Sequence, residues 1–175
     1  PVINKELGIR KGVLSQSVRL ASPFVEQGVP TICFCGSRLH TEVLARYLRE
    51  RFCRRPGTGH KVASYRGGYL PGMRRQIEQG LRDGDITCVV STNALELGID
   101  IGQLDVAILA GYPGSVASLW QQGGRAGRGE RRSIVLMVAR NSPMDQYVVT
   151  NPDWLLSSPP EHARIDADNL MVLVS

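Results

Sequence analysis

The chain has 175 residues, of which 42% are hydrophobic, and it carries a formal net charge of +5. This length suits one compact domain with modest extensions. No apolar run is long enough to span a membrane and no signal peptide is evident, so we expect no membrane partner. The basic balance is compatible with a nucleic-acid or nucleotide partner, although charge alone does not decide between partners.

The four cysteines, Cys33, Cys35, Cys53 and Cys88, form no Cys-x-x-Cys pair. Cys33 and Cys35 alternate within an apolar run, so both should face the same side of one strand. We interpret Cys33, Cys35 and Cys88 as small core residues, and we predict no metal site. Free thiols favour a reducing compartment, so the expected location is the cytoplasm.

Short apolar runs alternate with helical patterns along the chain, which is typical of a layered α/β fold. A helix over 12–27 opens the chain, and the strand 31–35 and the helix 37–52 follow. The next elements are the strand 61–65, the helix 71–82, and the strands 86–91 and 104–109. The helix 115–123, the strand 133–139 and a helix over 144–149 complete the series. These elements predict a RecA-like lobe, with a mostly parallel five-stranded sheet and helices on both faces.

Polar residues and glycines follow three of the predicted strands. They are Ser37, Arg38, Arg66, Gly67, Thr92 and Asn93. In open parallel sheets, ligands bind beyond the carboxyl ends of the strands, and helix N-termini attract phosphate. Taken one at a time, these segments also have plain structural interpretations, namely a capping serine, a glycine turn with a solvated arginine, and a capped helical turn.

The segment from Trp120 to Gly129 contains Gln121, Gly124, Arg125 and Arg128 in the pattern Q-x-x-G-R-x-x-R. Arginine grips phosphate oxygens with a planar fork and keeps its charge. Two arginines three residues apart on one helical turn would both reach a single triphosphate. The alternative interpretation is a flexible basic segment that binds RNA loosely.

This pattern resembles motif VI, the arginine-finger motif of superfamily 2 helicases. Residues 31–38, 65–69 and 89–101 resemble motifs IV, IVa and V in the same order, each at a strand end that faces one edge of the sheet. The wider sequence, including STNALELGIDIGQLD and GYPGSVASLWQQGGRAGR, resembles the YprA/MrfA-type bacterial DNA-repair helicases. That resemblance implies the second RecA-like lobe of an ATP-driven DNA translocase.

The resemblance also implies roles for individual residues. Arg128 would be the transition-state finger, Arg125 a ground-state phosphate contact, and Gln121 a residue that positions water or the γ-phosphate. Gly98, Asp100 and Gly124 would lie toward the nucleotide. The six strand-end residues would contact the phosphate backbone of DNA.

A GxxxxGK[ST] phosphate loop and a DE-x-H magnesium box are both missing from the sequence. The resemblance therefore implies that ATP and Mg²⁺ are bound mainly by a first RecA-like lobe, and that the partners are this lobe and single-stranded or partly duplex DNA. The chain begins with Pro1, so we expect an excised piece that does not hydrolyse ATP alone.

We divide the chain into a lead-in segment and helix (1–29), a helicase C-terminal domain (30–150) and a tail (151–175) that leads toward a missing downstream domain. Relatives usually carry a four-cysteine zinc region downstream, and the cysteines here are in the wrong places to form it. In the tail, Asn151-Pro152 and Pro159-Pro160 should break regular structure, and Trp154, Leu155 and Leu156 should pack back on the domain. Two alternatives stay open: an RNA helicase lobe, and a non-catalytic nucleic-acid-binding module.

Overall fold

The computed structural model describes residues 2–4, 9–53, 61–96, 101–127 and 132–161. Its centre is a five-stranded sheet in the order β4-β5-β3-β6-β7, in which every neighbouring pair is parallel. The strands are β3 (Thr31–Cys35), β4 (Lys61–Tyr65), β5 (Ile86–Ser91), β6 (Val106–Ala110) and β7 (Ile134–Met137). The predicted α/β, RecA-like fold is confirmed, and the sheet is wholly parallel.

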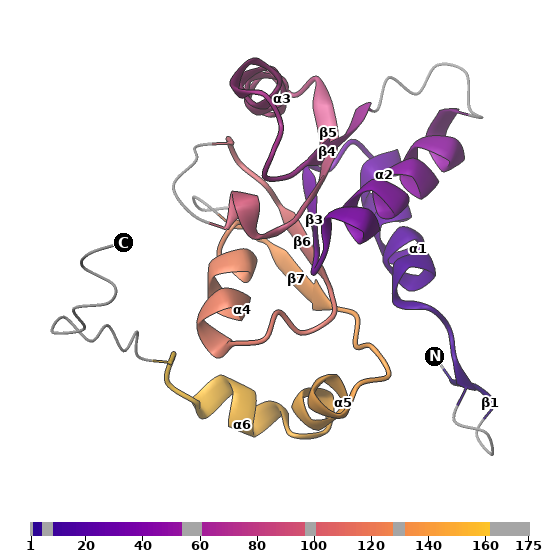
Figure 1. The fold of residues 1–175 in the computed structure, drawn as a ribbon, viewed down its shortest axis with the longest axis vertical. Helices are drawn as coiled ribbons and strands as arrows, with labels where there is room; N and C mark the ends of the chain where they lie inside the picture. Colours follow the sequence, from indigo (N-terminus) through magenta and orange to yellow (C-terminus); the bar gives the residue numbers. More distant parts are fainter. Residues whose placement is uncertain (1, 5–8, 54–60, 97–100, 128–131, 162–175) are drawn as a thin grey trace, which may run out of the picture.

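Helices cover both faces of this sheet (Figure 1). Helices α1 (Val13–Glu26) and α2 (Arg38–Cys53) pack over one face, where a core cluster contains Cys33, Leu44 and Ile108. Helices α3 (Pro71–Arg82) and α4 (Val116–Gly123) pack over the other face, where a second cluster contains Ile32, Leu81 and Leu119. Alternate residues of each strand therefore feed two separate cores, as expected for a sheet buried on both sides.

The cysteine interpretation is confirmed, because Cys33, Cys35 and Cys88 are buried free thiols in the first cluster. Burial raises the pKa of Cys35 to about 12, with a further contribution from Cys33, so its thiol is neutral at pH 7. Among the described residues, no three His, Cys, Asp or Glu side chains gather as a metal site would require. None of the helices in the described ranges is long and apolar enough to cross a membrane.

Local signals explain where the elements begin and end. Pro71 starts α3 at a position where its missing N–H costs nothing, and Gly84 follows the helix with a φ of 78°. The backbone N–H of His40 donates to Ser37 Oγ at 3.2 Å, which confirms Ser37 as the cap of α2. The other predicted strands and helices agree with the structure to within two residues at each end.

Short elements lie at both ends of the chain. Strands β1 (Val2–Asn4) and β2 (Ile9–Arg10) form an antiparallel pair before α1. After β7 come α5 (Pro143–Thr150) and α6 (Pro152–Ser157). The expectation that Asn151-Pro152 breaks regular structure is confirmed, because α5 ends at Thr150 and a new helix begins only at Pro152, whose first-turn position tolerates proline.

The residues of α6 divide between the core and the surface. Trp154 and Leu155 pack on the second core cluster as predicted, whereas Leu156 is 67% exposed and does not. At the other end of the chain, α1 contacts α2, β3 and β6. The division at 29/30 and 150/151 stays a prediction.

Candidate nucleic-acid interface

Three of the predicted motifs meet at one edge of the sheet, where β4, β5 and β3 end side by side. Ser91 pairs with Tyr65 of β4 and with Phe34 of β3, so the segments that follow these residues are neighbours. The backbone N–H of Thr92 donates to the carbonyl of Tyr65 at 3.3 Å, which fastens two of these segments together. The strand-end positions predicted from the sequence therefore share one edge.

Arg38 and Gly67 approach each other across this edge. Arg38 is exposed on the first turn of α2, and its Nη2 lies 4.0 Å from the position that a Cβ on Gly67 would take. Because Gly67 has no side chain, a ligand backbone can come close to the Arg38 guanidinium.

Arg66 is held by a carboxylate that sequence reasoning missed. Its Nε donates to Glu42 Oε1 at 2.9 Å, and its Cζ lies 4.8 Å from the centre of the Tyr69 ring. The hydroxyls of Tyr69 and Ser64 donate to the same carboxylate at 2.6 and 3.0 Å. Burial by itself would raise the pKa of Glu42, but the bonds from Tyr69, Arg66 and Ser64 outweigh it and lower that pKa. Glu42 is therefore ionised at pH 7 and orients Arg66.

Thr92 and Asn93 begin the 3₁₀ turn η1 (Asn93–Leu95). Thr92 is buried, and its Oγ1 accepts a bond from the N–H of Ala94 at 3.4 Å, whereas Asn93 is exposed. Gly98 and Asp100, which were predicted to face the nucleotide, lie outside the described residues.

The arginine motif departs from the expectation that Arg125 and Arg128 share a helical turn. Helix α4 ends at Gly123, and a Cβ on Gly124 would lie only 2.9 Å from the carbonyl oxygen of Trp120, so the helix end itself requires glycine there. Ala126 then forms a parallel bridge with Leu104, and Gly127 has a φ of 89°. The expected shared turn is wrong because the chain has left the helix before Arg128, which lies outside the described residues.

The motif also lies at a different edge of the sheet from the one expected. Leu104, the bridge partner of Ala126, precedes β6, so this part of the motif lies beside the amino end of that strand. The other three motifs follow the carboxyl ends of their strands. The expectation that all four motifs face one edge is therefore wrong, because α4 carries the chain back along β6.

Arg125 faces protein, being only 7% exposed. Its Nε and Nη2 donate to the backbone carbonyl of Glu96 at 3.0 and 2.6 Å. Gln122 Nε2 donates to Glu96 Oε2 at 3.1 Å, while the predicted Gln121 is exposed. Arg125 and Gln122 together fasten the segment after β5 to the end of α4, and neither Glu96 nor Gln122 was foreseen from the sequence.

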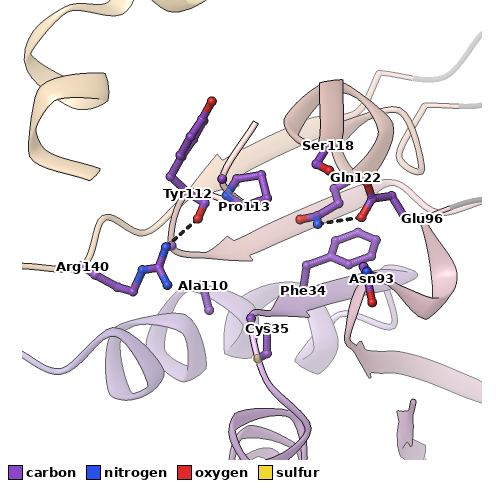
Figure 2. A pocket seen from close by; sticks show the side chains of 13 residues that line it. Phe34, Cys35, Asn93, Glu96, Ala110, Tyr112, Pro113, Ser118, Gln122 and Arg140 are labelled. Carbon is purple, nitrogen blue, oxygen red and sulfur yellow. Dashed lines mark hydrogen bonds between the residues drawn. The ribbon is translucent and has the colours of Figure 1, made fainter. Parts of the chain in front are cut away.

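A cleft of about 340 Å³ opens between the ends of β3 and β6, α4 and the segment after β5. Figure 2 shows Phe34 and Cys35 along one side, the Glu96–Gln122 pair at one end and Arg140 at the other. The predicted Asn93 lines this cleft. The cleft thus continues the row of strand-end residues from β3 toward β6.

Comparison with known proteins identifies the family. The helicase conserved C-terminal domain matches residues 14–130. The chain is 50% identical over 174 residues to the ATP-dependent helicase YprA of Bacillus subtilis (strain 168), across 99% of this chain and 23% of YprA. The crystal structure of the DUF1998 helicase MrfA bound to DNA and AMPPNP matches with a TM-score of 0.91 and 49% identity, over 99% of this chain and 24% of that one.

A more distant match is the helicase Lhr of Mycobacterium smegmatis bound to ssDNA and AMP-PNP, with a TM-score of 0.75 and 30% identity over 92% of this chain and 21% of that one. The chain thus spans less than a quarter of the length of these relatives. It belongs to the helicase conserved C-terminal domain family, as a superfamily 2 RecA-like lobe of the YprA/MrfA type.

Proposed function

We propose that this chain is the second motor lobe of an ATP-dependent DNA helicase or translocase that acts in DNA repair. The observation that carries the proposal is the shared edge at the ends of β4, β5 and β3, where Arg66, Thr92 and Ser37 follow paired residues. The solved relatives MrfA and Lhr hold DNA and an ATP analogue, which supports both ligands. The assignment to repair rests on the family resemblance alone.

On the DNA side, this lobe supplies contacts to phosphates. Arg38 and Arg66 provide cations, Thr92 and Asn93 provide polar groups, and the capped start of α2 at Ser37 provides backbone N–H groups. Gly67 lets the strand approach closely. Because such contacts do not read base edges, we expect little sequence preference and a marked dependence on salt.

On the nucleotide side, the helicase is driven by the hydrolysis of ATP. We assign Arg128 as the arginine finger that contacts the transferring phosphoryl group. The described conformation gives Arg125 a different task, since its guanidinium is committed to the carbonyl of Glu96. A contact between Arg125 and a phosphate requires the guanidinium to leave that carbonyl. Gln121 is exposed and therefore free to approach a ligand, whereas Gly98, Asp100 and Gly124 stay predictions for the nucleotide side.

Glu96 links the two sides of the lobe. Its carbonyl binds Arg125 of the arginine motif, and its side chain lines the strand-end cleft beside Gln122. A movement of the arginine motif toward ATP would therefore be transmitted to the DNA edge through the short hydrogen-bonded segment that contains Glu96.

The test is ATP hydrolysis by the helicase polypeptide that contains this lobe, measured with single-stranded DNA, with RNA of the same sequence, or with neither. Arg128→Ala is compared with Arg75→Ala, which removes the same charge from an exposed position on α3. We expect strong stimulation by DNA alone, loss of turnover in Arg128→Ala, and normal turnover in Arg75→Ala. Stimulation by RNA instead would make this an RNA helicase lobe, and no hydrolysis under any condition would leave only a binding module.

The 175-residue chain tested alone should show no ATP turnover above background. Robust turnover by this chain, abolished by Arg128→Ala, would contradict the assignment of Mg²⁺ and triphosphate binding to a first lobe.

A further inference from the structure

Arg140 follows β7 and lies across the end of β6, at the far end of the cleft from Glu96 (Figure 2). Its Nη2 donates to the carbonyl of Tyr112 at 2.5 Å and to Asp145 Oδ1 at 3.1 Å, and its Nε donates to Asp145 Oδ2 at 3.2 Å. A Cβ on Gly111 would overlap the guanidinium, so only glycine at this position lets Arg140 lie here. The side chain is therefore fixed in one place before any ligand arrives.

The carboxylate that fixes Arg140 is turned into the protein. Asp145 is 1% exposed and accepts bonds from the backbone N–H groups of Tyr112 and Arg140 at 3.0 and 2.8 Å. The hydroxyl of Ser142 donates to it at 2.7 Å. The side chain of Arg140, by contrast, is 42% exposed. The pair therefore presents its cationic end to the cleft and keeps its anionic end buried.

The remaining nitrogen of Arg140 points toward the open end of β3. Nη1 lies 3.8 Å from the position that a Cβ on Gly36 would take. Gly36, Gly111 and Gly114 all line the cleft and place no side chain in it. A ligand backbone can therefore approach Nη1 closely, one residue from the capping Ser37.

We propose that Arg140 binds a phosphate group of the DNA strand in this cleft, and so extends the phosphate contacts from the ends of β4, β5 and β3 to the end of β6. This inference rests on the proposed function. Nε and Nη2 are occupied by Asp145 and Tyr112, so Nη1 is left to donate one charge-assisted hydrogen bond to a phosphate oxygen. The carboxylate of Glu96 repels phosphate from the opposite end, which directs the anion to Arg140.

The position of the cleft favours a strand phosphate over a free nucleotide. The Glu96–Gln122 pair stands between the cleft and the arginine motif, because Glu96 turns its carbonyl to Arg125 and its side chain to the cleft. The volume of about 340 Å³ lies within the range for ligand sites, roughly 300–1,000 Å³, and can hold a single nucleotide unit.

The experiment measures fluorescence anisotropy of labelled oligo-dT bound by the helicase polypeptide that contains this lobe, over a series of salt concentrations. Arg140→Ala should weaken binding about tenfold and reduce the slope of log K against log salt by about 0.7, the value for one single-strand phosphate contact. Arg140→Lys should keep the slope and lose less affinity. Arg46→Ala, which removes an exposed charge on α2 that pairs with Glu50, should leave both quantities unchanged.

A second variant leaves Arg140 in place. Gly36→Asp would deliver a carboxylate to Nη1 and should lower both affinity and slope, whereas Gly36→Ala adds only a Cβ at ordinary contact distance from Nη1, and should keep the slope and lose less affinity than Gly36→Asp. This pair keeps the test decisive if thermal unfolding shows that Arg140→Ala is not folded.

The outcomes separate this inference from the proposed function. An unchanged slope in Arg140→Ala and Gly36→Asp, with a reduced slope in Arg66→Ala, overturns the role of Arg140 and leaves the DNA edge intact. Unchanged slopes in all three variants overturn the DNA edge itself. If Arg140→Ala binds AMPPNP more weakly in the absence of DNA, and its slope of log K against log salt for oligo-dT is unchanged, Arg140 binds a free nucleotide. That result would contradict the assignment of Arg140 to a strand phosphate.

Discussion

The two edge strands of the sheet, β4 and β7, are each followed by an arginine that a carboxylate holds, yet the two pairs differ in burial. Arg66 and Glu42 are 30% and 39% exposed, so water reaches both partners. Arg140 is 42% exposed, but Asp145 is only 1% exposed. An ion pair open to water contributes little and exchanges partners readily, whereas a buried carboxylate with several donors does not.

The difference suggests two modes of holding a strand. Arg66 can leave Glu42 for a phosphate, because Tyr69 and Ser64 still satisfy that carboxylate. Arg140 cannot leave Asp145 without depriving a buried carboxylate of its cation, which is costly in free energy. It therefore offers a phosphate only Nη1, the nitrogen that Asp145 and Tyr112 do not bind. We therefore propose an exchangeable contact at β4 and a fixed one at the end of β6.

Removal of each carboxylate should show the largest contrast. Asp145→Ala leaves the buried backbone N–H of Tyr112, the part-buried N–H of Arg140 and the Arg140 guanidinium without their acceptor, and should lower the free energy of unfolding by about 3 kcal/mol. Glu42→Ala should cost about 1 kcal/mol or less, because its partners regain water. Urea unfolding of the 175-residue chain, followed by circular dichroism, checks this. Equal losses in the two variants would remove the distinction between the pairs.

Low pH should reduce the stability that the buried carboxylate of Asp145 contributes. Burial alone would raise the pKa of Asp145, but the bonds from Arg140, Ser142 and Tyr112 outweigh it and hold that pKa below its ordinary value of about 3.9. The stability that Asp145 contributes is therefore fully present above about pH 4 and is lost as the pH falls through its lowered pKa. Urea midpoints of wild type should drop steeply below pH 4, and those of Asp145→Asn should drop less. Parallel curves would show that Asp145 does not carry the acid dependence.

Neutral variants of the two carboxylates should change DNA affinity in opposite directions. Glu42→Gln frees Arg66 from a competing charge and should tighten oligo-dT binding about two- to threefold. Asp145→Asn loosens the fixed geometry of Arg140 and should weaken binding by a similar factor. Both variants remove one negative charge, so a general charge effect would tighten binding in both. Tighter binding by both variants in anisotropy titrations would therefore contradict the fixed role of Asp145.

A third carboxylate, that of Glu161, is more exposed to water than those of Glu42 and Asp145. Glu161 accepts bonds from the backbone N–H groups of Val116 and Ala117 at 2.8 and 2.9 Å, at the N-terminus of α4. These bonds lower the pKa of Glu161. Glu161→Gln should shift the thermal unfolding midpoint less than Glu42→Gln does, because Glu161 is exposed and water can replace the one acceptor oxygen that the amide lacks. A larger shift would mean that Glu161 holds α4 in place.

The sequence predicted most of the fold because its signals are local. Pro71 and Gly84 mark the ends of α3, the continuous apolar run of β5 marks a buried parallel strand, and Ser37 caps α2. Asn151-Pro152 was correctly predicted as a break after α5, but the new helix that begins at Pro152 was not predicted, because a proline that starts a helix and one that breaks a helix look alike in the sequence. The end of α4 at Gly123 was predicted, but the bridge from Ala126 to Leu104, which places the arginine motif beside the amino end of β6, follows from no local pattern.

The candidate site was only partly predictable, since its strand-end residues follow recognisable strands but their partners lie far away in the sequence. Glu42 is 24 residues from Arg66, and Glu96 is 29 residues from Arg125. Asp145 carried a usable signal, because Ser142-x-x-Asp145 has the spacing of a capping box at the start of α5. That spacing places a carboxylate at the helix start but does not reveal that it binds Arg140.

The most direct test of the central claim is a crystal structure of the helicase polypeptide that contains this lobe, with single-stranded oligo-dT bound. The account predicts strand phosphates within hydrogen-bond distance of Arg66, Thr92 and the start of α2, with a further phosphate at Arg140. A strand that runs over another face of the lobe and leaves these strand ends empty would contradict the account.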